Sequence, residues 1–353
     1  MAASATPCRV ALIGMGAVNQ NLLQVIQSKQ DVLLSQYCFS VVIVAAADSG
    51  GAVSSPEGLS VEDLLATKRK KQSVISLGSH YFLEGGAVAI AETVDFDVLV
   101  ESCVCQIEPS FPCTLAALSR GKDVVLANKA PLVHDWAGIF ATAHKSGAEV
   151  AYSATVCGGL PVINVGTRDL VAATFSRIEG SFNSTSNYIL DAMAKGDSFE
   201  SALAEAQRLG IAEADPSLDV DGIDTANKLV IIANSILKPR TCVSLADVDI
   251  TGIRTISSQQ IAEAAQQNQA YRLVASAEPA SPPGSWALRV QPLPLPKDGF
   301  LGGITGWEMG VVFHSDLFET MWLKIDEPNV VPTACAVLRD IVNVWSKHRP
   351  TNT

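Results

Sequence analysis

Short apolar runs alternate with segments of helical periodicity through the first part of the chain. The runs are rich in Val, Ile, Leu and Ala, and between them apolar residues recur every three or four positions. Such alternation predicts parallel strands joined by right-handed helical crossovers. We therefore expect an α/β, doubly wound (Rossmann-type) sheet that binds ligands at the carboxyl ends of its strands. The expected strands are 9–14, 39–48, 96–103, 123–128 and 148–156, and the expected helices are 17–29, 61–70, 111–121 and 136–147.

The pattern changes after residue 158. A strand and a polar turn are followed by helices that an acidic loop separates, which predicts a second domain of the α+β class. The later stretch 278–296 is rich in proline. Because proline cannot donate a hydrogen bond to a neighbouring strand, we expect the ordered parts of this stretch to be edge strands and turns.

A glycine-rich turn follows the first strand, in VALIGMGAVNQNLL at 10–23. Gly14 would allow a tight turn, and Gly16 would let the backbone approach a pyrophosphate, which the first N–H groups of the next helix would bind. The dinucleotide fingerprint G-x-G-x-x-G has Asn19 in place of its third glycine. That glycine serves helix–strand packing, so we interpret Asn19 as a packing variation that leaves the anion site in place.

Asp48 ends the second strand, where a carboxylate commonly accepts hydrogen bonds from the adenosine ribose. This position favours NAD, because a carboxylate repels the 2′-phosphate of NADP. Ser49 and the basic run 68–71 are groups that would bind such a phosphate. The sequence therefore leaves the choice between NAD and NADP open.

An acidic block precedes the helix that contains Asp224 and Lys228. These two residues are four positions apart and share a helix face, as in many surface ion pairs. The block also contains Glu213, Asp215 and Asp219, so a pocket for an ammonium group is the alternative interpretation.

Composition limits the partners. The chain has 353 residues, of which 48% are hydrophobic, and a formal net charge of -11, which argues against a nucleic-acid surface. No apolar run is long enough to span a membrane, and MAASATPCRV lacks the pattern of a secretory signal. The eight cysteines form no zinc-site pattern and are expected to be buried, reduced thiols. We expect a cytoplasmic protein that binds small molecules, and we leave the plastid stroma open as a location.

Five blocks of sequence, in order, resemble homoserine dehydrogenase. The resemblance extends over nearly the whole chain, from the glycine-rich turn to the C-terminal helix. The blocks are ANKAPL (127–132), ATVCGGLPVI (154–163), FNSTSNYIL (182–190), GIAEADPSLDVDGIDTANKLVI (210–231) and PTACAVLRDIV (332–342).

The resemblance implies a reversible NAD(P)-dependent hydride transfer between L-homoserine and L-aspartate 4-semialdehyde, a step towards threonine, methionine and isoleucine. It also implies a homodimer formed through the middle domain. The implied domains are 1–157 for the cofactor, 158–310 for substrate and dimerisation, and 311–353 returning to the cofactor domain.

Residue roles carry over by position. Lys129 and Lys228 match lysines at the reacting group, and Asp224 would orient Lys228. Glu213 matches the carboxylate that holds the substrate ammonium, with Asp219, Thr185 and Ser184 as further contacts. The expected cofactor contacts are Gly14, Gly16, Ala17, Val18, Asn19, Asp48, Ser49, Cys103 and Lys129.

The sequence departs from the family at several positions. Ser184 replaces a glycine, Ile211 replaces a tyrosine, and 326–329 replaces a glycine-rich loop that faces the nicotinamide. Ser153 replaces a glutamate that in many members helps hold a monovalent cation, which would lie near Val156 and Gly158. These changes leave two alternatives: a dehydrogenase of the same fold for another amino-acid aldehyde or hydroxy acid, and a non-catalytic nucleotide-binding protein.

Overall fold

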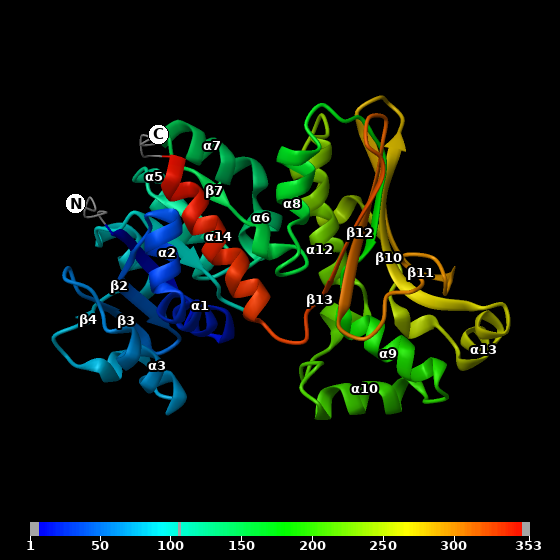
Figure 1. Ribbon diagram of the computed structural model, residues 1–353, viewed down its shortest axis with the longest axis horizontal. Helices are drawn as coiled ribbons and strands as arrows, with labels where there is room; N and C mark the ends of the chain where they lie inside the picture. The colour runs from blue at the N-terminus through cyan, green and yellow to red at the C-terminus, as the bar shows by residue number, and fades with distance from the viewer. Residues whose placement is uncertain (1–6, 105–106, 348–353) are drawn as a thin grey trace. The chain divides into compact units, whose positions relative to one another are not determined.

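The computed structural model describes residues 7–104 and 107–347 of the chain. Residues 1–6, which carry part of the expectation about a secretory signal, and Cys105 lie outside this range. The chain forms two compact units, 1–159 with 329–353, and 160–328 (Figure 1). The expected boundary at 310/311 differs from the division at 328/329. The difference arises because residues 311–328 contain most of one strand and the whole of the next strand in the sheet of the second unit.

The first unit is built on a seven-stranded sheet in the order β4-β3-β2-β1-β5-β6-β7. The run from β2 to β7 is parallel, and β3 and β4 add an antiparallel edge. The central strands are covered on both faces, which explains their continuous apolar sequences. The α/β, Rossmann-type fold is thereby confirmed. The strands are β1 (Cys8–Ile13), β2 (Val41–Asp48), β3 (Gly51–Ser54), β4 (Phe82–Leu83), β5 (Val98–Glu101), β6 (Asp123–Leu126) and β7 (Val150–Ala151).

Helices connect these strands. The four expected helices are present, and the structure adds α2, α4 and α6, which the sequence did not indicate. The helices are α1 (Ala17–Ser28), α2 (Gln30–Tyr37), α3 (Val61–Arg69), α4 (Gly86–Thr93), α5 (Ser110–Ser119), α6 (Ala130–His134), α7 (Trp136–Ser146) and α14 (Val331–Lys347).

Helix α14 lies far along the chain yet completes the first unit. Its apolar face includes Ala334, Val337 and Ile341, all fully buried or nearly so. These side chains share one core with residues of α1 and β1, including Leu22 and Val10. The hydrophobic face of α1 is therefore covered by residues that follow the whole second unit in sequence (Figure 1).

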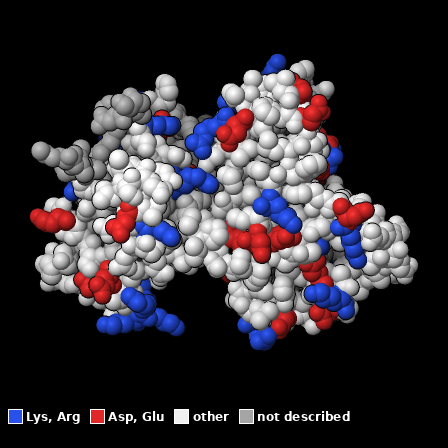
Figure 2. Space-filling view, viewed as in Figure 1, with Lys and Arg blue, Asp and Glu red and all other residues white. Residues whose placement is uncertain are grey.

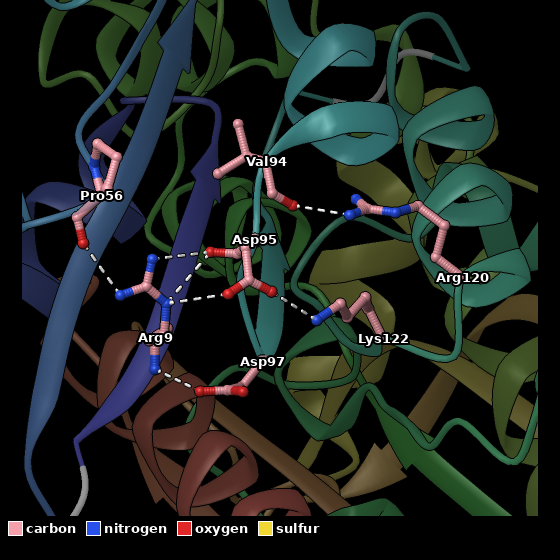
Figure 3. Close-up of polar contacts among 7 residues, drawn as sticks. All are labelled: Arg9, Pro56, Val94, Asp95, Asp97, Arg120 and Lys122. Atoms are coloured by element: carbon pink, nitrogen blue, oxygen red, sulfur yellow. Dashed lines mark hydrogen bonds and ion pairs between the residues drawn. The ribbon is translucent and has the colours of Figure 1, made fainter.

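A polar network ties together the amino ends of the parallel strands (Figure 3). The Arg9 guanidinium donates to the carbonyls of Asp95 and Pro56, and the Arg9 backbone N–H donates to the carboxylate of Asp97 at 2.8 Å. Lys122 donates to the side chain of Asp95 at 3.1 Å. These polar groups are hydrogen-bonded to one another at the amino ends of the strands. Ligands are expected at the carboxyl ends, on the opposite side of the sheet.

The second unit has a six-stranded sheet in the order β13-β12-β8-β10-β11-β9, covered by helices as expected for the α+β class. The strands are β8 (Phe175–Ser181), β9 (Val248–Ile250), β10 (Gln269–Ala280), β11 (Ser285–Pro296), β12 (Glu308–Ser315) and β13 (Glu319–Asp326). The helices are α8 (Val162–Asn164), α9 (Ser184–Ala194), α10 (Phe199–Arg208), α11 (Ser217–Val220), α12 (Ile223–Ile232) and α13 (Ser258–Gln266).

The proline-rich stretch forms the second strand of a long hairpin. β11 pairs with β10 over its whole length, but β9 covers only Leu288–Val290 on its other side. Pro292, Pro294 and Pro296 lie beyond that short contact, where the free side of β11 requires no further donor. The expectation of edge strands thus holds locally, although β11 as a whole is not an edge strand.

Within residues 7–104 and 107–347, no helix is long and apolar enough to cross a membrane.

Candidate active site

A cavity of about 360 Å³ lies at the carboxyl ends of β1, β2 and β5 in the first unit. Five of the expected cofactor residues line it: Gly14, Gly16, Asp48, Ser49 and Cys103. The other four, Ala17, Val18, Asn19 and Lys129, are not among its lining residues.

The glycine-rich turn has the geometry that a pyrophosphate requires. Gly14 has φ +84°, and a Cβ there would lie 2.9 Å from the backbone nitrogen of Cys103. Gly16 precedes α1 as its N-cap, and a Cβ built on it would meet nothing within 4 Å. The first N–H groups of α1 therefore adjoin open space, and these residues fit a dinucleotide cofactor.

Asn19 turns inward instead of facing the cavity. It is fully buried, and its amide donates to the carbonyl of Gly14 at 2.7 Å. The side chain thus closes the turn onto the start of α1, in the place where the fingerprint has a glycine.

The Asp48 carboxylate is engaged by four donors, which the sequence did not reveal. Oδ1 accepts from the Ser73 hydroxyl at 2.6 Å and the Gly50 N–H at 2.9 Å. Oδ2 accepts from Lys68 Nζ at 2.6 Å and the Val74 N–H at 3.0 Å. Burial alone would raise the pKa of Asp48, but these hydrogen bonds outweigh it and hold the pKa below its usual value.

A chain of hydrogen bonds runs from the end of β5 towards Lys129. Ser110 donates to the buried carboxylate of Glu101 at 2.8 Å, and the amide of Asn128 donates to Ser110 at 3.1 Å. The side-chain oxygen of Asn128 also accepts a hydrogen bond, at 3.0 Å, from the N–H of Ala130, the first residue of α6. Lys129 is the N-cap of α6, so its backbone position is fixed by this buried chain.

The two thiols near this site have raised pKa values. Burial, together with the neighbouring Glu101, raises the pKa of Cys103 to about 12, and similar causes raise the pKa of Cys113 to about 12. The seven described cysteines are not disulfide-bonded, but the expectation that all are buried is wrong. Cys38, Cys242 and Cys335 are exposed.

In the second unit, Lys228 is held between two oxygens. Its Nζ lies 2.7 Å from Asp224 Oδ2 and donates to the carbonyl of Phe182 at 2.6 Å. Only 12% of the lysine side chain and 15% of the aspartate side chain are exposed. This is therefore not the solvated surface pair that the spacing alone would indicate.

Asn183 joins the acidic residues to this lysine. Its amide donates to Asp219 at 2.6 Å and to Asp224 at 3.0 Å. Its carbonyl oxygen accepts the N–H of Ser186 and caps α9. Asn183 is not among the residues predicted from the sequence, although an asparagine whose side chain accepts the N–H three residues later at a helix start is a recognisable N-cap signal.

The remaining expected substrate residues lie on the neighbouring segments. Ser184 opens α9, and Thr185 donates to the carbonyl of Ile211 at 3.2 Å. Glu213 is exposed on the loop after α10, and its backbone carbonyl accepts a hydrogen bond from the Gln207 side chain at 3.1 Å. The structure thus groups Asp219, Asp224 and Lys228 directly, and links Thr185 to the loop that contains Glu213.

The residues around position 153 do not fit the monovalent cation that the resemblance implies. Ser153 donates its N–H and its hydroxyl to Asp340, at 2.8 and 2.6 Å. The Arg339 guanidinium donates to the same hydroxyl at 2.9 Å. The Ser153 hydroxyl is therefore engaged on both sides, by an aspartate and an arginine that themselves lie 4.0 Å apart, instead of being available to a cation near Val156 and Gly158. The described residues also contain no cluster of three His, Cys, Asp or Glu side chains suited to a metal.

Two family models match the chain. "Homoserine dehydrogenase" matches residues 161–342, and "Homoserine dehydrogenase, NAD binding domain" matches residues 14–153. A homoserine dehydrogenase of Methanocaldococcus jannaschii is 30% identical, covering 96% of this chain and 98% of that protein. An NAD(+)-dependent homoserine dehydrogenase of Pseudomonas canavaninivorans is 32% identical, covering 96% of each.

Solved structures agree. A homoserine dehydrogenase from Thiobacillus denitrificans superposes with a TM-score of 0.83 at 27% identity, covering 97% of this chain and 74% of that one. A hyperthermophilic archaeal homoserine dehydrogenase in complex with NADPH gives a TM-score of 0.83 over 98% of this chain and 99% of that one. At 23% identity, this second likeness shows the fold alone.

Proposed function

The chain belongs to the homoserine dehydrogenase family, and from this premise we propose that it interconverts L-homoserine and L-aspartate 4-semialdehyde with Lys228 and Lys129 at the reacting oxygen. The observation that carries the proposal is the position of Lys228, whose ammonium group is fixed by Asp224 and the Phe182 carbonyl. The enzyme uses NAD(P), which when bound supplies or accepts the hydride.

Lys228 is suited to stabilise charge on the substrate oxygen. During reduction of an aldehyde, negative charge develops on that oxygen, and a preorganised ammonium group lowers the energy of this state without moving. Asp224 holds the ammonium group of Lys228 in position, and Asn183 keeps Asp224 in place. Lys129 is assigned the second cationic role, that of stabilising or relaying a proton at the same oxygen.

The acidic loop is proposed to recognise the amino group of the substrate. Glu213 would hold the ammonium, and Asp219 would contribute further negative charge. Thr185 and Ser184 lie in the turn beside this loop and would contact the amino acid. This arrangement suits a zwitterionic substrate, since carboxylates attract its ammonium while lysine neutralises its developing alkoxide.

A related hydroxy amino acid is the second candidate substrate, because Ile211 places an apolar side chain where the family has a tyrosine. The two substrates are separated by comparing kcat/KM for homoserine with that for a panel of related alcohols. A non-catalytic role is not favoured, because the matching relatives are named as dehydrogenases.

We further propose a homodimer formed through the second unit. β13 is an edge strand of the sheet, and Trp322 on this strand is 57% exposed. An exposed edge with a large apolar side chain is a frequent pairing site between subunits. Sedimentation velocity would give a dimer for the native chain and a shift towards monomer for Trp322→Lys. A native monomer would refute this part of the proposal. We assign a reducing compartment, the cytoplasm or the plastid stroma, because none of the seven described cysteines is disulfide-bonded.

The main test is the change in absorbance at 340 nm on mixing the protein with L-homoserine and NAD or NADP. We expect Lys228→Met to lower kcat about 10³-fold with a smaller change in KM. Lys195→Met, on an exposed lysine of the same unit, is the matched control and keeps full activity. If Lys228→Met retained kcat within tenfold, the assigned role of Lys228 would be wrong.

A further inference from the structure

Glu101 is a buried carboxyl group that the proposed reaction does not use. It ends β5 and has 0% of its surface exposed, whereas Figure 2 shows acidic side chains spread over the visible face among Lys and Arg. Burial raises the pKa of this carboxyl above its ordinary value of 4.5, so its position costs free energy once it ionises. Buried titratable groups of this kind cluster at functional sites.

One oxygen of Glu101 accepts two hydrogen bonds, and these lead to different segments. Oε1 accepts from the backbone N–H of Cys103 at 2.7 Å and from the hydroxyl of Ser110 at 2.8 Å. The other oxygen, Oε2, is buried and has no hydrogen-bond partner among the described residues. Oε1 can accept both bonds whether or not the carboxyl is charged, so this connection requires an acceptor and not a charge.

The hydrogen bond from Cys103 fixes one wall of the cofactor cavity. Ser102 and Cys103 both line the cavity, and a Cβ on Gly14 would lie 2.9 Å from the backbone nitrogen of Cys103. The Ser102 hydroxyl also donates to the carbonyl of Gly14 at 3.2 Å. The glycine-rich turn therefore packs directly on the segment that Glu101 holds, and a shift of Cys103 would shift the turn with it.

The hydrogen bond from Ser110 leads to Lys129. The Asn128 amide donates to the Ser110 oxygen at 3.1 Å, and its own oxygen accepts the N–H of Ala130 at 3.0 Å. Ser110 is fully buried, and Asn128 is 4% exposed. The Asn128 side chain thus extends past Lys129 in sequence and fixes the peptide group that joins Lys129 to Ala130.

We propose that Glu101 is a positioning residue, whose single acceptor atom holds Lys129 and the wall of the cofactor cavity in fixed relative positions. The proposal rests on the proposed function, in that Lys129 acts at the substrate oxygen and NAD(P) binds this cavity. Hydride transfer requires a fixed distance between the cofactor and the groups at the reacting oxygen, and a misplacement of about 1 Å can lower the rate on the order of 10²-fold. A shared buried anchor prevents the two segments from moving independently.

The test compares three variants of the full chain. Calorimetry gives dissociation constants for NAD⁺ and NADP⁺, and steady-state assays give kcat and KM for homoserine. Glu101→Met removes the acceptor, so we expect both cofactors to bind about fivefold or more weakly and kcat to fall about tenfold or more, with a smaller change in KM. Ser110→Ala interrupts only the path to Lys129, so kcat should fall similarly while the dissociation constants stay within about twofold.

Glu101→Gln is the conservative variant. Its amide oxygen can replace Oε1 as the acceptor of both hydrogen bonds, so kcat and the dissociation constants should stay within about threefold of the native values. Proton transfer by Glu101 would instead require the carboxyl group, which glutamine lacks. This variant therefore separates positioning from acid–base catalysis.

Thr114→Val is the matched control. Thr114 is fully buried on the same helix as Ser110, but its hydroxyl donates to the backbone carbonyl of Ser110 and not to the path that leads to Lys129. This variant should leave kcat and both dissociation constants within about twofold. Melting temperatures are measured for every variant, and the assays are run well below the lowest of them. A purely structural role of Glu101 would lower the melting temperature and leave kcat of the folded protein unchanged.

Three outcomes would overturn the proposal. The first is a folded Glu101→Met protein with native kcat, and the second is a Glu101→Gln protein as impaired as Glu101→Met. The third is a fully additive loss of kcat in the double variant of Glu101→Met and Ser110→Ala, because two residues of one path should not lose activity independently. If the native chain binds NAD⁺ but does not oxidise homoserine, the proposed function fails. The dissociation constants of Glu101→Met and Glu101→Gln then still decide whether Glu101 positions the cavity wall.

Discussion

The carboxylate of Asp340 accepts two hydrogen bonds from Ser153, one from its N–H at 2.8 Å and one from its hydroxyl at 2.6 Å, although 187 positions separate the residues. Both side chains are buried. The pair holds α14 against the segment that follows β7. Asp340 thus accepts hydrogen bonds from buried polar groups of the same unit that lie far earlier in the sequence.

Removing this carboxylate should destabilise the first unit. Asp340→Ala leaves the N–H and hydroxyl of Ser153 without their acceptor in a buried place, and we expect a loss of about 3 kcal/mol in the free energy of unfolding. Urea unfolding measures the change. Ser346→Ala, on an exposed part of α14, is the control and should cost less than about 0.5 kcal/mol. Equal losses in the two variants would contradict this account.

Activity should not depend on an alkali cation. Ser153 stands where many family members have a cation-binding glutamate, and its hydroxyl is already engaged by Asp340 at 2.6 Å and by Arg339 at 2.9 Å. We expect kcat/KM for homoserine to agree within about twofold in potassium, sodium and tetramethylammonium chloride of equal ionic strength. A tenfold loss in tetramethylammonium would show that a small cation does bind.

Stability should fall as pH rises above the ordinary titration range of glutamate, because of Glu101. Burial raises the pKa of this carboxyl from 4.5, so the folded protein keeps a proton that the unfolded chain loses. Between the two pKa values, stability falls by about 1.4 kcal/mol per pH unit from this group, and its full contribution is present only below the unfolded value.

Glu101→Gln keeps the shape without the titration. We therefore expect its stability to change less with pH, so that the native chain loses stability relative to Glu101→Gln as pH rises above 4.5. Urea unfolding at several pH values gives both curves. Parallel curves would mean that Glu101 titrates alike in the folded and unfolded states.

Asn19 should stabilise the cofactor turn better than the glycine of the fingerprint would. Asn19→Ala removes the 2.7 Å bond to Gly14 and should cost about 1 kcal/mol. Asn19→Gly should cost a further ~1 kcal/mol, because glycine inside a helix is less favourable than alanine. Thermal unfolding and the dissociation constant for NAD⁺ are measured together, with Gln24→Ala on the exposed face of α1 as control. A more stable Asn19→Gly protein would refute this role.

The sequence predicted the parts of the fold that depend on local periodicity. The apolar run in 39–48 and the helices between the strands were recognisable because each is long enough to show its repeat. β3 and β4 were missed, since these antiparallel strands at one edge of the sheet are defined by the strands they pair with and not by an apolar run of their own.

The candidate site was predictable where the sequence resembles the family. Lys228 and Asp224 were chosen from that resemblance, because their spacing alone equally suits a surface ion pair, and their pairing is observed. Asn183 and Glu101 were missed, because their importance comes from partners that only the folded chain brings within reach. Asp48 was selected correctly as a residue of the cavity, but the sequence did not show that Lys68 would engage it.

The division of the first unit into 1–159 and 329–353 has a consequence for biosynthesis. While the second unit is being translated, the apolar faces of α1 and β1 that α14 will cover have no partner from this chain. At roughly 5–20 residues per second, that interval lasts on the order of ten seconds. We therefore expect the nascent chain to bind chaperones through these faces until α14 leaves the ribosome.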